Sequence, residues 1–67
     1  MEYIEISKVR KGDYVKRSPD AKTVYIRGVF VRGWSDGKGR YSLTDTDDYN
    51  REIFVKGGKK VYVGFTY

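Results

Sequence analysis

Apolar and polar residues alternate along most of this chain, and this two-residue period constrains the fold more than any other feature. The alternation is clear in "YIEI" at residues 3–6, where Ile4 and Ile6 are the apolar members. Residues two apart lie on the same face of a β-strand, whereas a helix needs apolar residues spaced by three and four. The sequence therefore predicts an all-β protein.

The same pattern indicates several more strands, separated by short turns that contain glycine. The further strands are predicted at residues 13–18, 23–34, 40–45, 51–57 and 60–67. The turn signals stand at residues 11–13, 36–37 and 57–58. A chain of 67 residues is long enough for one domain. Short antiparallel strands in so small a domain usually close into a barrel, which removes free sheet edges. We expect one domain, residues 1–67, that forms a five- or six-stranded antiparallel barrel of SH3-like type. A small OB-like barrel is the alternative.

Gly28 interrupts the longest predicted strand, residues 23–34. A glycine inside a strand often marks a β-bulge or a sharp bend. A bulge here would move Val29 and Val31 onto the core face of the strand, and without a bulge Phe30 would take that position. The sequence leaves both arrangements open.

The chain contains no Cys and no His, which excludes several kinds of chemistry. Thiol nucleophiles, Cys/His zinc sites and His-based acid–base catalysis all need one of these residues. No apolar run approaches the ~20 residues of a membrane span, and residues 1–11 lack the pattern of a signal peptide. The absence of Cys also fits a reducing cytoplasm. We therefore expect a cytoplasmic protein that is not an enzyme, has no cofactor or metal, and does not enter a membrane.

Three aspartates, Asp45, Asp47 and Asp48, lie close together in a chain whose net charge is +5. A calcium-binding loop needs Gly at its sixth position and Glu at its twelfth, and neither residue stands there when Asp45 is taken as the first. A pair of catalytic carboxylates needs a cleft, for which a domain this small has little room. The spacing is typical of a capped turn. We predict a solvated turn at residues 46–50, with an acidic patch that faces a partner as the alternative.

Aromatic residues make up 16% of the chain, and seven of them are Tyr, so several rings should lie at least partly exposed. Strand alternation puts Tyr25 and Arg27 on the face opposite Val24 and Ile26, which we expect to be the core face. A sheet face of rings and cations can stack bases and hold phosphates. Tyrosines that seal a barrel end and lysines that protect an edge strand are the structural alternative. The residues predicted to bind nucleic acid are Tyr14, Lys16, Tyr25, Arg27, Tyr62, Lys56, Lys59 and Lys60.

Trp34 precedes the predicted turn at residues 36–37, where it either covers the core or projects as an anchor for a partner. Trp and Tyr are enriched among the residues that contribute most to protein interfaces. The residues predicted for protein interaction are Trp34, Asp45, Asp47 and Asp48.

Two stretches of the chain, "KGDYVKRSPDAKTVYIRG" and "NREIFVKGGKKVYVGFTY", resemble short uncharacterised proteins of bacteriophages and prophages. The resemblance implies a phage or mobile-element protein that acts in the bacterial cytoplasm, and it implies no particular activity or site residues. Small phage proteins often bind a host enzyme. We therefore expect a binding module for nucleic acid, with binding of a host protein as the alternative. Neither the residues nor the resemblance predicts an oligomeric state.

Overall fold

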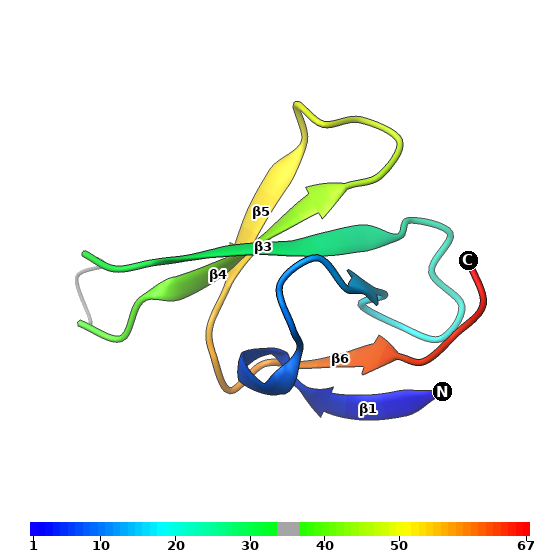
Figure 1. Cartoon of the computed structure of the whole chain (residues 1–67), viewed down its shortest axis with the longest axis horizontal. Coiled ribbons are helices and arrows are strands. Elements are labelled where there is room, and N and C mark those ends of the chain that lie inside the picture. Colours follow the sequence, from blue (N-terminus) through cyan, green and yellow to red (C-terminus); the bar gives the residue numbers. More distant parts are fainter. Residues whose placement is uncertain (34–36) are drawn as a thin grey trace.

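The computed structural model describes residues 1–33 and 37–67, which form short β-strands joined by turns and loops (Figure 1). In chain order the elements are β1 (Glu2–Glu5), the 3-10 turn η1 (Ile6–Lys8), β2 (Tyr14–Val15), β3 (Tyr25–Val31), β4 (Arg40–Asp45), β5 (Glu52–Val55) and β6 (Lys60–Val63). All paired strands are antiparallel. The predicted all-β class with five or six antiparallel strands is confirmed.

The strands form two sheets that share one short segment of backbone. β1 and β6 make a two-stranded sheet, while β2, β3, β4 and β5 follow one another in a four-stranded sheet. Lys16, the residue after β2, pairs with Tyr62 of β6, and each backbone amide donates to the other's carbonyl, at 3.0 and 2.9 Å. The larger sheet is curled as a half-barrel, and the small sheet lies beneath it (Figure 1).

The core lies between the two sheets and draws on both of them. Its buried side chains are Ile6, Val9, Val15, Tyr25, Leu43 and Val61. Leu43 belongs to the larger sheet and Val61 to the smaller one, and both are completely buried. Complete burial of a Leu or Val side chain stabilises a fold by about 1.5–3 kcal/mol relative to exposure. These contacts therefore hold the small sheet against the larger one.

Tyr25 lies in the core with an exposure of 5%, so the prediction that its ring stands on an exposed face is wrong. Its partner in β2 is Val15, and Arg27, two residues further on, pairs with Leu43. Residues that pair directly across two strands point to the same face of the sheet. The prediction assumed that Val24 and Tyr25 point to opposite faces of one strand. Val24 lies before the start of β3, however, and both residues are buried.

The sequence leaves two arrangements open at Gly28, and the structure has an irregularity in the strand pairing there, with an effect that differs from the one expected of a bulge. The register of β3 against β4 shifts between Arg27 and Phe30. Since Arg27 already faces the core side, the shift brings Phe30 to that side, where its ring centroid lies 4.8 Å from that of Tyr41. Val29 is 48% exposed, so the expectation that a bulge would turn this residue toward the core is wrong.

The close approach of β3 to the start of β4 leads to a test with two glycines. Gly39 has a φ of 75°, and a Cβ added there would lie 2.9 Å from the carbonyl oxygen of Val31. Gly37 has a similar φ of 73°, but nothing lies within 4 Å of an added Cβ. Left-handed strain costs about 1–2 kcal/mol for any residue with a Cβ. We expect Gly37→Ala to lower the free energy of unfolding by this amount and Gly39→Ala to lower it further, as measured by urea denaturation. Equal losses for the two variants would contradict the packing at Gly39.

Candidate nucleic-acid interface

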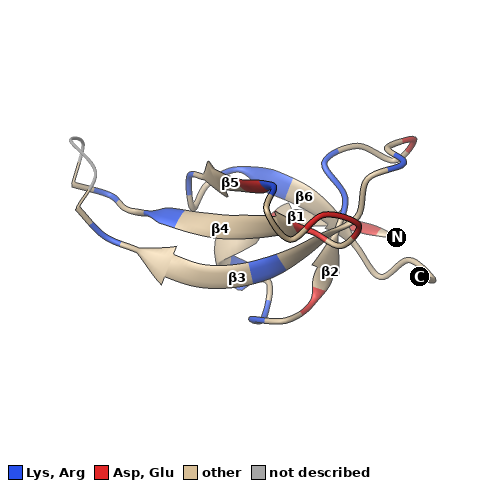
Figure 2. Cartoon of the chain, turned by 90° about the horizontal axis from the view of Figure 1, so that it is seen from above, with Lys and Arg blue, Asp and Glu red and all other residues tan. Residues whose placement is uncertain are grey.

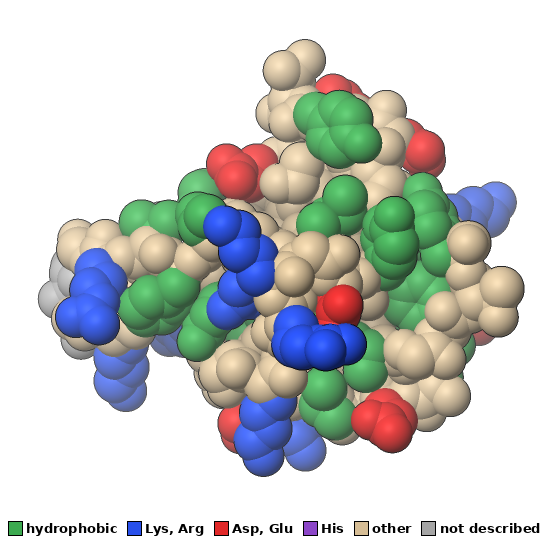
Figure 3. Space-filling view, viewed as in Figure 1, with side chains coloured by type: hydrophobic (Ala, Val, Ile, Leu, Met, Phe, Trp, Pro, Cys, Tyr) green, Lys and Arg blue, Asp and Glu red, His purple; other side chains and the backbone are tan. Residues whose placement is uncertain are grey.

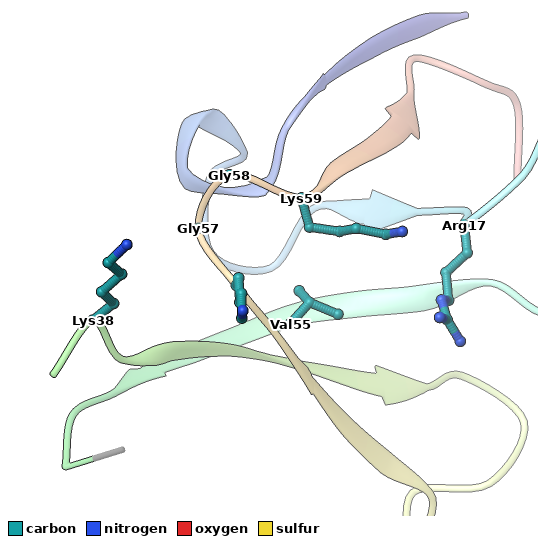
Figure 4. Close-up of a pocket in the computed structure, with 7 residues that line it drawn as sticks. Arg17, Lys38, Val55, Gly57, Gly58 and Lys59 are labelled. Atoms are coloured by element: carbon teal, nitrogen blue, oxygen red, sulfur yellow. The ribbon is translucent and has the colours of Figure 1, made fainter. Parts of the chain in front are cut away.

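A hollow of about 630 Å³, here called the basic pocket, opens beside the end of β5 (Figure 4). Its lining residues are Arg17, Lys38, Val55, Lys56, Gly57, Gly58 and Lys59. Four of these described residues carry a positive charge, and none of them carries a carboxylate. Pockets for small molecules and cofactors have volumes of about 300–1,000 Å³. The basic pocket therefore has the size and the charge to take an anionic ligand.

Three separate segments of the chain bring the cations of the basic pocket together. β5 ends at Val55, and a turn then leads into β6, closed by a 2.9 Å hydrogen bond from the Lys59 amide to the Lys56 carbonyl. Arg17 follows directly after the residue that pairs β2 with β6, and Lys38 comes from the segment before β4. Figure 4 shows the side chain of Lys59 extending toward that of Arg17, with Val55 below Lys59. The basic pocket thus depends on tertiary structure and not on one basic run.

Gly57 and Gly58 are the central residues of that turn, and neither has a positive φ. Such a turn accepts most residue types, so the backbone does not require glycine here. A Cβ added to Gly58 would meet nothing within 4 Å, and one added to Gly57 would lie 3.4 Å from the Tyr41 ring, an ordinary contact. The two glycines therefore leave bare backbone in the lining of the basic pocket.

A second group of predicted residues lies on the face of the small sheet turned away from the core. The rings of Tyr3 and Tyr62, which are paired across β1 and β6, stack with centroids 4.4 Å apart. The Nζ of Lys60 lies 5.6 Å from the Tyr3 centroid, and the Nζ of Lys16 lies 4.8 Å from the Phe65 centroid. Contacts between a cation and a ring contribute about 0.5–1 kcal/mol at exposed sites. These two lysines are engaged with rings and do not line the basic pocket.

Tyr14 and Arg27, which were also predicted to bind nucleic acid, contact other aromatic rings outside the basic pocket. The Tyr14 ring centroid is 4.6 Å from that of Tyr67, whose hydroxyl donates a 2.7 Å hydrogen bond to the hydroxyl oxygen of Thr46. The Arg27 guanidinium lies 4.5 Å from the centroid of the Tyr41 ring. The structure therefore does not gather the predicted nucleic-acid-binding residues on one sheet face.

The Lys and Arg residues as a whole are distributed over several strands and loops of the chain (Figure 2). On the face seen in Figure 3, apolar and neutral surface separates the groups of Lys and Arg. Lys56 and Lys59 were predicted as phosphate contacts and line the basic pocket, whereas Arg17 and Lys38 were not predicted. No pattern within a single segment indicates that these two residues meet the others. The basic pocket therefore combines two predicted cations with two that were not predicted.

The acidic residues organise the connection between β4 and β5. The Asp45 carboxylate accepts a 2.8 Å hydrogen bond from the Asp47 amide, and the Asp48 carboxylate accepts one of 3.1 Å from the Asn50 amide. Bonds from a side chain to the backbone two residues later are typical of Asp in turns. The predicted turn is confirmed, although Asp45 is buried and not solvated. Among the described residues, no group of three or more acidic side chains is arranged to hold a metal ion.

Trp34, predicted either to cover the core or to anchor a partner, lies outside the described residues.

No helix in the described part of the chain has the length and apolar character to cross a membrane. Comparison with known proteins found no matching family model, no matching curated protein and no matching solved structure. The function is therefore inferred from the geometry and charge of the described residues.

The open space around Gly58 leads to a prediction about stability. We expect Gly58→Ala to raise the free energy of unfolding by about 0.4–1 kcal/mol, because alanine restricts the unfolded chain more than glycine does and meets no clash in the fold. Urea denaturation of the wild type and the variant measures the difference. A loss of stability would show that the Gly57–Gly58 turn has a different backbone conformation.

Proposed function

We propose that this protein is a non-enzymatic module that binds nucleic acid by receiving its phosphates in the basic pocket. The observation that carries the proposal is the convergence of Arg17, Lys38, Lys56 and Lys59 in one hollow whose described lining has no carboxylate. Four like charges in one hollow repel one another. A phosphate chain that binds there neutralises them and releases its own counterions, which favours binding at low salt.

Two features of the chain support a binding role over catalysis. The lack of His and Cys leaves the carboxylates as the main candidates for acid–base chemistry. Asp45 and Asp48 are both engaged in hydrogen bonds that shape the β4–β5 turn. The basic pocket itself offers cations, which hold an anion but do not by themselves supply a general base.

The barrel type in this proposal is SH3-like. The pairing of the first strand with the last, and the antiparallel meander of β2, β3, β4 and β5, support this barrel type. The proposed setting is the bacterial cytoplasm, and it rests on the resemblance to phage and prophage proteins.

The proposal predicts binding that depends steeply on salt. If four cations contact phosphates of a single strand, the logarithm of the affinity should fall against the logarithm of salt with a slope of about −3. Affinity should then fall roughly 50-fold between about 50 and 200 mM salt. Fluorescence anisotropy with labelled single- and double-stranded DNA and RNA measures this. Arg17→Ala and Lys59→Ala should each weaken binding by up to about tenfold and reduce the slope by about 0.7.

Arg51→Ala is the matched control for these variants. Arg51 is exposed and precedes β5, whereas the basic pocket lies at the other end of that strand. Its removal lowers the net charge by the same amount but should change affinity only slightly. Equal losses in all three variants would mean that binding follows net charge and not the basic pocket. No binding at about 50 mM salt would refute the proposal.

Protein binding is the second candidate function, and exposed apolar side chains favour it. Val29 and Phe54 have exposures of 48% and 40% on two strands of the larger sheet. Exposed apolar patches of this kind often mark interaction sites. A host protein that binds this surface would lose affinity when Val29 and Phe54 are both changed to Ser, while Arg17→Ala would have little effect.

A further inference from the structure

The basic pocket combines an apolar base with a charged rim. Val55 is half-buried and packs against the core, and the Gly57–Gly58 backbone beside it carries no side chains. The side chain of Lys59 extends toward that of Arg17, and Val55 lies below Lys59 in the same view (Figure 4). A lone phosphate would leave this apolar surface in contact with water. A flat ring would bury the surface and could stack on the guanidinium plane of Arg17.

We propose, building on the nucleic-acid binding proposed above, that the basic pocket takes one unpaired base of a single-stranded nucleic acid. The phosphates on either side of that base would contact the cations of the rim. A volume of about 630 Å³ suits a ligand of the size of one nucleotide unit. A base in a duplex is paired and stacked, and it must be flipped out before it can enter a pocket. The preferred ligand is therefore a single strand.

Gly58 is the residue on which this inference can be tested most directly. A Cβ added there has open space around it and would meet no atom within 4 Å. Gly58 also belongs to the lining of the basic pocket, so we expect a larger side chain there to reduce the space left for a base. The substitution leaves every cation of the rim in place, so the phosphate contacts should persist. Substitution of Gly58 consequently separates recognition of the base from attraction of the phosphates.

The experiment compares two fluorescein-labelled strands of about ten nucleotides, one an oligothymidylate and the other with the same phosphates but abasic sugars. Anisotropy at about 50 mM salt gives the affinity of the wild type, Gly58→Ala and Gly58→Val for each strand. We expect the wild type to prefer the oligothymidylate by about 5- to 150-fold, the range for one stacked base. Gly58→Val should lose this preference and keep the affinity for the abasic strand, and Gly58→Ala should lose part of it. A duplex of the same length should bind more tightly than the abasic strand only to the extent that its higher charge density explains.

The possible outcomes separate this inference from the proposed function. Equal wild-type affinity for both strands would overturn the base pocket and leave phosphate binding intact. A preference that survives in Gly58→Val would also overturn it, because the base would then bind elsewhere. Failure of both strands to bind would refute the proposed function and this inference with it. Thermal unfolding shows whether Gly58→Val is folded. If it is not, the inference is tested by the wild-type preference for the oligothymidylate over the abasic strand and by its partial loss in Gly58→Ala.

Discussion

The backbone pairing of Lys16 with Tyr62 determines how the rest of the molecule is arranged. β2 pairs with β3 through two residues, and the next residue, Lys16, pairs with β6 through two hydrogen bonds. One short segment therefore belongs to both sheets and holds the small sheet in place over the core. Arg17 follows immediately, so the same joint sets its position relative to the turn that carries Lys59. Stability and the basic pocket depend on one local feature.

The basic pocket concentrates like charges in a protein with a small core. Two unit charges 4 Å apart repel by about 1 kcal/mol in water, and domains are typically stable by about 5–15 kcal/mol in total. Arg17, Lys38, Lys56 and Lys59 are all exposed, so water and salt screen their repulsion and the fold tolerates it. A bound phosphate chain would remove what repulsion remains, and this provides a direct link between the fold's electrostatics and the proposed ligand.

Local patterns in the sequence predict the strands well and the basic pocket only in part. Alternation correctly places Val61 in the core and Tyr62 away from it, and the Gly57–Gly58 turn is found where the dipeptide indicates. Alternation gives the wrong face for Tyr25. The buried Val24 lies before β3, so its burial does not indicate which residues of the strand face the core. Lys56 and Lys59 are indicated by a short basic run. Arg17 and Lys38 join them only through non-local pairing of strands, which no single stretch of sequence reveals.

The most direct test of phosphate binding at the basic pocket is a titration of the ¹⁵N-labelled protein with unlabelled oligothymidylate, followed by the backbone amide shifts. We expect the largest changes at Arg17, Val55 and the turn from Lys56 to Lys59, with smaller changes at Tyr14 and in the β4–β5 turn. Changes concentrated at Tyr14, or spread evenly over the surface, would contradict the assignment of the basic pocket as the site where nucleic acid binds.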